Sequence, residues 1–327
     1  MSRLWLHASL FLLTFFTTTV AGVQWIGRDP FELLNLQYGL PYSISILFVL
    51  GMHEFGHYFA ARYHRVDATL PYFIPFPPTP FFLNFGTLGA LIRTKSAVPS
   101  RRAMFDIGVA GPLAGFLACV AVLAYGFLTL PGRDFILSVH PNYDFIANST
   151  NEAQGIPLEF GQTLMFQFLT WLLTDPSVQF VPPMSEIYHY PYLCVGWFGL
   201  FVTAMNLIPI GQYDGGHLSY TMLGKYHRLI SKASFLILLT LGFPSVVDAL
   251  IREVVGLVDG TYPEQIIPLA QYSWSGWFLW AIISFYFVKL YHPAIDDDTP
   301  LDPRRMFVGW LTFAVFALCF SLSPFTI

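Results

Sequence analysis

One short stretch decides how this chain folds: Gly51-Met52-His53-Glu54-Phe55-Gly56-His57. Its two histidines stand four residues apart, a spacing that places both imidazole rings on one face of an α-helix, one turn apart. Glu54 follows His53 directly, so its carboxylate lies beside the same face. These side chains therefore form a compact polar group if the stretch is helical.

The sequence on either side of this group is almost wholly apolar. Residues 42–50 read YSISILFVL, and residues 58–61 read YFAA. Ionisable side chains in such a segment are costly without partners, and they typically mark a functional site. We therefore expect a buried or intramembrane site rather than a solvated helix face.

The pattern His-Glu-x-x-His is suited to zinc. Neutral imidazole binds Zn²⁺ at about 2.0–2.1 Å, and the ion lowers the pKa of a bound water toward neutrality. A neighbouring carboxylate can take the proton of that water as it attacks a carbonyl group. The pattern is the HExxH signature of metallopeptidases, with His53 and His57 as metal ligands and Glu54 as the catalytic base.

Composition places the chain in a lipid bilayer. Of 327 residues, 55% are hydrophobic and only 11% are charged, whereas soluble proteins carry about 25% charged residues. The net charge of −4 gives no sign of nucleic-acid binding. The cysteines lie in apolar segments without a CxxC pair, so we expect core residues rather than disulfides or zinc ligands: Cys119, Cys194 and Cys319.

The hydropathy pattern predicts an all-α polytopic membrane protein with about six to seven transmembrane helices and a small re-entrant β-hairpin. The first apolar run could instead be a signal peptide, but its length favours a transmembrane helix. In the third span, Gly111 and Gly115 form a small-xxx-small pair that lets another helix approach closely. The expected spans are 4–23, 41–63, 104–130, a span from 192 to the polar group near 206–217, 233–251, 274–291 and 306–325.

Charge asymmetry predicts the orientation. Residues 62–102 contain six Lys or Arg and one Asp, whereas residues 131–191 contain one basic and six acidic residues. The first segment is therefore expected to be cytoplasmic and the second external. Residues 225–232 carry three unopposed basic side chains and mark a second cytoplasmic loop.

The segment from Leu70 to Arg93 is too apolar for a solvated loop and too rich in proline for a helix. It is either a loop on the headgroups or a re-entrant hairpin with a strand near residues 87–94, tolerated at membrane depth because it lines a cavity. We expect the strand edge to pair with an unwound substrate segment; the alternative is a simple lid. The expected substrate-binding residues here are Gly86, Thr87, Leu88 and Gly89.

Two histidines leave a zinc ion one protein ligand short. Asp214 is the other acid embedded in an apolar segment on the same side of the membrane, so we predict it as the third ligand. His217, one turn further on, is the alternative ligand or a supporting group. Asn206 could hydrogen-bond the substrate or a bent backbone, or simply join two helices. His64 is expected to be a solvated histidine, and residues 296–298, three aspartates, a solvated loop.

At this point the chain resembles the site-2 protease family of intramembrane zinc metallopeptidases. The family motifs HExxH and NxxPxxxxDG occur at residues 53–57 and 206–215. The sequences of residues 85–90 and 105–115 are similar to the plant-plastid and bacterial branch. The resemblance covers residues 41–224, which suggests a division into 1–40, 41–224 and 225–327. The external segment is too short for the PDZ domain of many relatives.

The resemblance implies hydrolysis of peptide bonds within transmembrane segments of membrane-protein substrates, with Zn²⁺ as cofactor. It implies a multi-pass protein of the bacterial inner membrane, with a plastid-type membrane as the alternative, and makes no prediction of the oligomeric state. Two other classes fit the buried polar groups: an ion transporter or channel built around Asp214, or an inactive protease-like binding protein. The intact Glu54 favours the enzyme, because neither alternative needs a base between two ligands.

Overall fold

The computed structural model describes residues 4–77, 84–145, 149–150, 158–293, 297 and 299–326. It is mostly helical, with three small two-stranded antiparallel sheets, β1–β2, β3–β4 and β5–β6. The helices are α1 Leu4–Trp25, α2 Leu36–Tyr63, α3 Arg101–Leu128, α4 Arg133–Val139, α5 Leu164–Leu173, α6 Pro191–Asn206, α7 Asp214–Leu223, α8 His227–Asp259, α9 Ser275–Ile283 and α10 Pro303–Cys319. The strands are β1 Tyr72–Pro75, β2 Thr87–Leu91, β3 Tyr143–Asp144, β4 Ser149–Thr150, β5 Glu159–Phe160 and β6 Phe325–Thr326.

Four helical segments of the described chain are long and apolar enough to cross a membrane: Leu4–Trp25, Leu33–Tyr63, Arg101–Leu128 and Asp214–Asp259. The other three expected spans are shorter helices: α6 has 16 residues, α10 has 17, and α9 has 9 and is continued by a π-turn. α5, with 10 residues, is also too short to span a bilayer.

Glycines bring α2 and α3 into close contact. A Cβ atom on Gly56 would lie 2.5 Å from the carbonyl oxygen of Ala110, closer than any side chain allows. On the facing side, a Cβ on Gly115 would lie 3.1 Å from the Cβ of His53. The close helix approach predicted from the small-xxx-small pair is therefore confirmed, and the face of α2 that meets these glycines is the face that carries the histidines.

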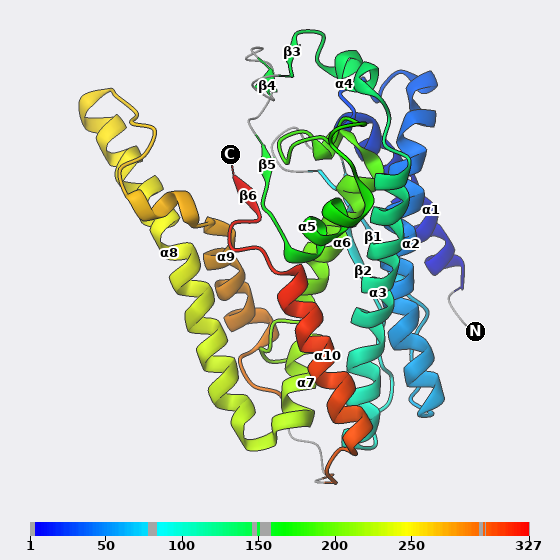
Figure 1. Ribbon diagram of the computed structural model, residues 1–327. Helices are drawn as coiled ribbons and strands as arrows, with labels where there is room; N and C mark the ends of the chain where they lie inside the picture. Colours follow the sequence, from blue (N-terminus) through cyan, green and yellow to red (C-terminus); the bar gives the residue numbers. More distant parts are fainter. Residues whose placement is uncertain are drawn as a thin grey trace.

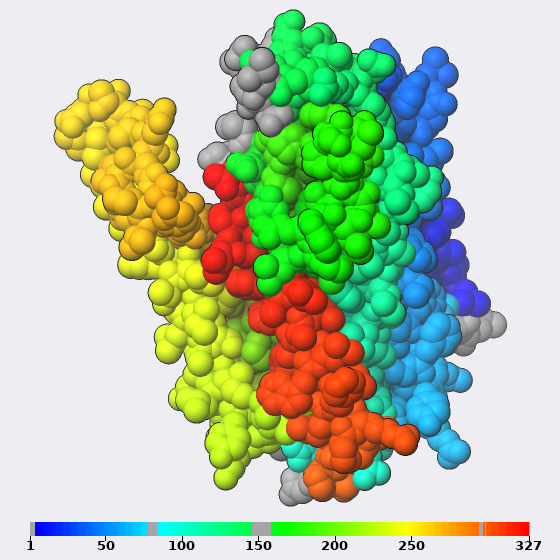
Figure 2. Space-filling view, in the orientation of Figure 1, coloured from blue at the N-terminus to red at the C-terminus, as the bar shows by residue number. Residues whose placement is uncertain are grey.

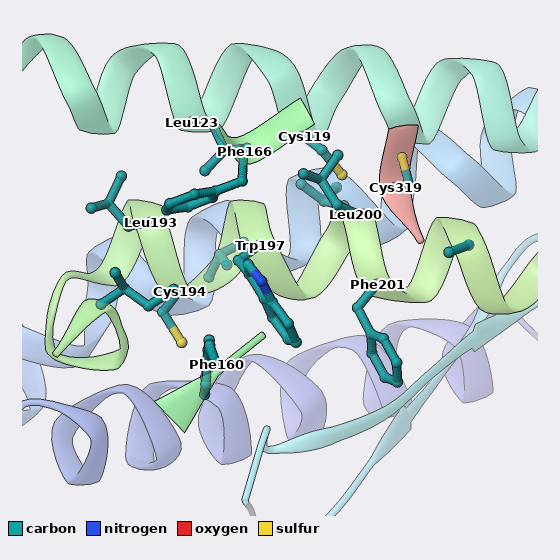
Figure 3. Packing of buried hydrophobic residues seen from close by; sticks show 14 of the residues in the cluster. Cys119, Leu123, Phe160, Phe166, Leu193, Cys194, Trp197, Leu200, Phe201 and Cys319 are labelled. Carbon is teal, nitrogen blue, oxygen red and sulfur yellow. The ribbon is translucent and has the colours of Figure 1, made fainter. Parts of the chain in front are cut away.

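Helix α6 lies in the centre of the apolar core (Figure 3). Its Trp197 and Leu200 are fully buried, and the ring of Trp197 stacks on Phe201 at 5.7 Å and tilts over Phe160 of β5 at 4.5 Å. All three cysteines are free and buried, so the expectation that they are core residues is confirmed. This packing holds α6 against α3 and orients its C-terminal end, Asn206, toward the histidines of α2.

The chain between α2 and α3 forms the expected β-hairpin. β1 pairs with β2 in the register Tyr72↔Leu91 and Phe73↔Ala90. The strand ends at Leu91, three residues earlier than the expected Thr94. The hairpin lies along α1 (Figure 1), where the hydroxyl group of Thr17 donates a 2.6 Å hydrogen bond to the carbonyl of Gly86. Residues 78–83 of the predicted hairpin lie outside the described residues.

The far end of α8 and the chain that follows it project from the rest of the bundle, as the yellow and orange arm in Figure 2 shows, whereas α9 packs on the apolar core through Trp277 and Ala281. α8 continues to Asp259, eight residues beyond the predicted end at Ile251. The prediction of its end was wrong because Arg252 and Glu253 limit the apolar stretch without interrupting helical hydrogen bonding. The helix stops at Gly260, which has a left-handed φ of 69°, the conformation that glycine adopts most easily at a helix C-terminus.

Candidate metal centre

The two histidines of α2 point to one spot. His53 and His57 are both 8% exposed, and their Nε2 atoms lie 3.1 Å apart. The Nδ1 atom of His57 is 2.7 Å from the carbonyl oxygen of Ile107 in α3. With the proton on Nδ1, this contact is a hydrogen bond that turns the Nε2 lone pair toward the spot, as in most histidine metal ligands.

Asp214 reaches the same spot from a distant part of the chain. Its Oδ2 atom lies 3.4 Å from Nε2 of His53 and 3.3 Å from Nε2 of His57. Asp214 is the first residue of α7, a position where the helix dipole favours a negative charge. The structure therefore places the carboxylate of Asp214 beside the two histidines, where the sequence analysis expected a third ligand.

A tight turn between α6 and α7 makes this approach possible. α6 ends at Asn206 and α7 begins at Asp214. A side chain on Gly215 would collide with the carbonyl oxygen of Leu207, and one on Gly216 with that of Gly211. The paired glycines after the aspartate therefore allow the start of α7 to fold back against the end of α6.

Helix α3 shapes the other wall of the site. A Cβ atom on Gly111 would lie 2.1 Å from Nε2 of His57. A Cβ on Gly115 would lie 3.1 Å from both Cβ and Nδ1 of His53. The two glycines therefore leave the space that the imidazole rings occupy.

The three donors fit a zinc ion. Bond lengths of about 2.0–2.2 Å in a tetrahedron place ligand atoms about 3.3–3.6 Å apart, and the three atoms here are separated by 3.1, 3.4 and 3.3 Å. Two imidazoles and one carboxylate are also a donor set that catalytic zinc sites use. Among the described residues, this group is one of two clusters able to hold a metal ion.

Glu54 and Asn206 flank the donors at a cavity of about 350 Å³. The carboxylate of Glu54 is buried beside the three donors, and the backbone of Ile92, directly after β2, lies near it. The amide Nδ2 atom of Asn206 lies 3.4 Å from Nε2 of His53. Both side chains therefore stand where a molecule in the cavity would meet the candidate metal centre.

Strand β2 forms one wall of this cavity. Thr87, Leu88 and Gly89 line it, opposite residues of α2 and α6. Leu88 is 66% exposed, and Gly89 has a φ of 100° with open space around its Cβ position. Gly86 is placed differently: it packs against the backbone of Thr17 and Thr18 in α1 rather than lining the cavity.

The remaining polar residues of the sequence have other partners. His217 lies with Nδ1 2.7 Å from Nε2 of His292, so it is not one of the three clustered donors. The expectation for His64 was wrong: its Nε2 atom contacts Asp106 at 2.8 Å, and Arg305 of α10 binds the same carboxylate. Such a pairing joins segments remote in sequence and leaves no local signal. Residues 296 and 298 of the aspartate run lie outside the described residues.

The second cluster was missed by the sequence reasoning. It consists of His140, Glu186 and His189, all in segments that connect the long helices. Glu186 and His189 form a Glu-x-x-His pattern, which puts both side chains on one side of a single turn. That spacing was the available signal, but their partner His140 lies 46 residues upstream of Glu186.

A mostly helical chain with long apolar helices and a His-His-Asp donor set is typical of a membrane metalloprotease. Residues 41–246 match Peptidase family M50. The chain therefore belongs to this family, the site-2 protease family, as its two motifs predicted.

Named relatives come from plants. The chain is 30% identical over 189 residues to "Probable zinc metalloprotease EGY1, chloroplastic" of Arabidopsis thaliana, covering 57% of this chain and 30% of that protein. It is 26% identical over 272 residues to "Probable zinc metalloprotease EGY2, chloroplastic" of Oryza sativa subsp. indica, covering 82% and 45%. The chain thus spans less than half the length of these relatives. No solved structure matches it.

Proposed function

We propose that this protein is an intramembrane zinc metalloprotease that hydrolyses peptide bonds within transmembrane segments of other membrane proteins. The observation that carries the proposal is the convergence of His53, His57 and Asp214 beside Glu54, at a cavity walled by a β-strand. A soluble protease would not need to build this site from apolar helices.

His53, His57 and Asp214 would hold the zinc ion. When bound, zinc supplies a Lewis acid that polarises a carbonyl group and makes a water molecule more acidic. Glu54 accepts the proton of the attacking water and passes it to the departing amide nitrogen. Asn206, beside His53, donates a hydrogen bond to the substrate backbone and helps to hold the scissile carbonyl group in place.

The strand β2 would hold the substrate. A peptide carbonyl inside a helix is already hydrogen-bonded, so the substrate must unwind locally before hydrolysis. Unpaired N–H and C=O groups are costly in hydrocarbon, and pairing the unwound segment with the cavity side of β2 satisfies both backbones. Thr87, Leu88 and Gly89 line the same cavity as Glu54.

The protein would sit in the membrane as a multi-pass protein, with residues 62–102 and 225–232 cytoplasmic and residues 131–191 external. The lysine and arginine asymmetry supports this orientation. We propose the bacterial inner membrane as its location. The alternative is a plastid-type membrane, which matches the chloroplastic location named for the plant relatives. The proposed partner is a single-span protein whose cleavage releases a cytoplasmic part.

Metal content and cleavage together test the proposal. The full chain in detergent should contain zinc and cleave a single-span substrate, and Glu54→Gln should keep the zinc and lose cleavage. Zinc without cleavage in the unchanged protein would favour a binding protein. Ion flux through reconstituted vesicles that is unaffected by Glu54→Gln would favour a transporter or channel.

A further inference from the structure

The cluster of His140, Glu186 and His189 lies at the end of the bundle where α4 is found (Figure 1). His140 directly follows α4, and His189 ends the short 3₁₀ turn before α6. The Nε2 atoms of the two rings are 3.1 Å apart. Oε2 of Glu186 lies 3.5 Å from Nε2 of His140 and 3.7 Å from Nε2 of His189.

This geometry closely resembles that of the candidate metal centre in α2 and α7. There the two imidazole nitrogens are also 3.1 Å apart, and the carboxylate oxygen lies 3.3 and 3.4 Å from them. Ligands of a tetrahedral zinc ion lie about 3.3–3.6 Å apart. Both clusters therefore need shifts of only a few tenths of an ångström to hold the same ion.

His189 is oriented as a metal ligand. Its Nδ1 atom lies 2.5 Å from the carbonyl oxygen of Trp25, at the end of α1. The Nδ1–H group donates this hydrogen bond, which leaves the lone pair of Nε2 facing His140 and Glu186. Metal-binding histidines are commonly oriented in this way by a carbonyl oxygen.

Glu186 lacks the partner that its burial demands. The residue is 3% exposed, and its buried Oε2 atom has no hydrogen-bond partner among the described residues. A cation at the centre of the cluster would balance the carboxylate, and the neutral imidazole is the form that binds metal.

A hydrogen bond between the two rings explains the cluster less completely. His140 could donate from Nε2 to Nε2 of His189, which would also give a separation of 3.1 Å. The same proton then cannot be donated to Glu186, so the buried Oε2 atom still lacks a hydrogen bond. One cation contacting all three atoms satisfies every member of the cluster.

We propose that His140, Glu186 and His189 form a second zinc site, separate from the candidate metal centre. Its ligands come from the end of α4 and from the turn before α6, and the carbonyl of Trp25 orients one of them. Zinc at this site joins the ends of α1, α4 and α6 and stabilises the connecting segments between them. The site does not depend on protease activity.

The test uses the full chain in detergent, without a polyhistidine tag and with His53→Ala and His57→Ala to remove the first centre. After incubation with zinc sulfate and desalting, this variant should retain about one zinc ion per chain by mass spectrometry. Adding Glu186→Gln, a change of nearly equal volume, should lower the zinc content to about zero. Glu159→Gln, the same change at an exposed position on β5, is the matched control and should retain the ion.

A cobalt(II) titration makes the test independent of how well the Glu186 variant folds. The double histidine variant, unchanged at the second site, should develop the visible absorption bands of tetrahedral cobalt at one equivalent. Absence of these bands, absence of zinc in the same variant, or zinc retention by the folded Glu186→Gln protein would overturn the proposal. None of these measurements uses cleavage, so their outcome does not depend on whether the protein is a protease. Failure of the second zinc site and failure of the protease proposal can therefore be told apart.

Discussion

Replacing Gly111 by alanine should disable the candidate metal centre by a single methyl group. The added Cβ would lie 2.1 Å from Nε2 of His57. An ordinary van der Waals contact begins at 3.4 Å, so the ring must move by about 1.3 Å if α3 stays in place. The neighbour that must move is itself a proposed metal ligand, whose position needs to be correct within about 0.5 Å.

The expected loss follows from this displacement. A misplacement of about 1 Å in a catalytic group costs about 10²-fold in rate, which corresponds to about 2.7 kcal/mol of barrier. We therefore expect Gly111→Ala to lower cleavage at least about 100-fold and to lower zinc content. Without a clash, the same change inside a helix stabilises by roughly 0.5–1 kcal/mol, so poor helix formation does not explain a loss.

Two further glycines provide a graded series. Gly115→Ala places a Cβ 3.1 Å from His53, which is only a few tenths of an ångström closer than an ordinary van der Waals contact. This variant should therefore lower cleavage less than tenfold. On α2, Gly51→Ala meets Phe73 at 4.0 Å and should keep full zinc and activity. Zinc content and cleavage of a single-span substrate are measured for all three variants. Equal activity in the three, or full zinc binding by Gly111→Ala, would refute the reasoning.

Three other predictions address the proposed mechanism and orientation. Glu54→Gln should keep zinc and lower cleavage about 10²–10⁴-fold, because it removes the proton acceptor alone; retained cleavage would contradict the mechanism. Single prolines at positions 88–92 should lower cleavage with a period of two, because proline removes one N–H group and β2 pairs with β1 on only one edge; a response that follows side-chain size in a parallel alanine scan would make the hairpin a lid. In intact cells, an impermeant thiol reagent should label a cysteine at position 150 but not at position 95, and the reverse pattern would invert the proposed orientation.

The parts of the site that were predicted from the sequence depend on short-range geometry. His53 and His57 share a helix face because of their spacing, and their apolar flanks predicted burial. Asp214 was found because it is a carboxylate without a partner in an apolar segment. Strand β2 was expected because its segment was too apolar for a solvated loop and too rich in proline for a helix.

The parts that were missed depend on contacts between distant segments. Arg305 binds Asp106 across 199 residues, and no local pattern predicts that pair. His140 meets His189 because α4 and the turn before α6 lie at the same end of the bundle. Gly86 has the left-handed conformation expected of a close backbone approach, but the approaching backbone belongs to α1.

The cavity beside the candidate metal centre is lined by two separate parts of the chain. Its donors, the strand β2 and helix α6 all lie within residues 41–246, the segment matched by the family. Trp280, which also lines the cavity, comes from α9, beyond the end of that segment. A substitution at Trp280 therefore changes the wall of the cavity while His53, His57 and Asp214 stay unchanged. The shape of the cavity can thus be varied at this wall separately from the candidate metal centre.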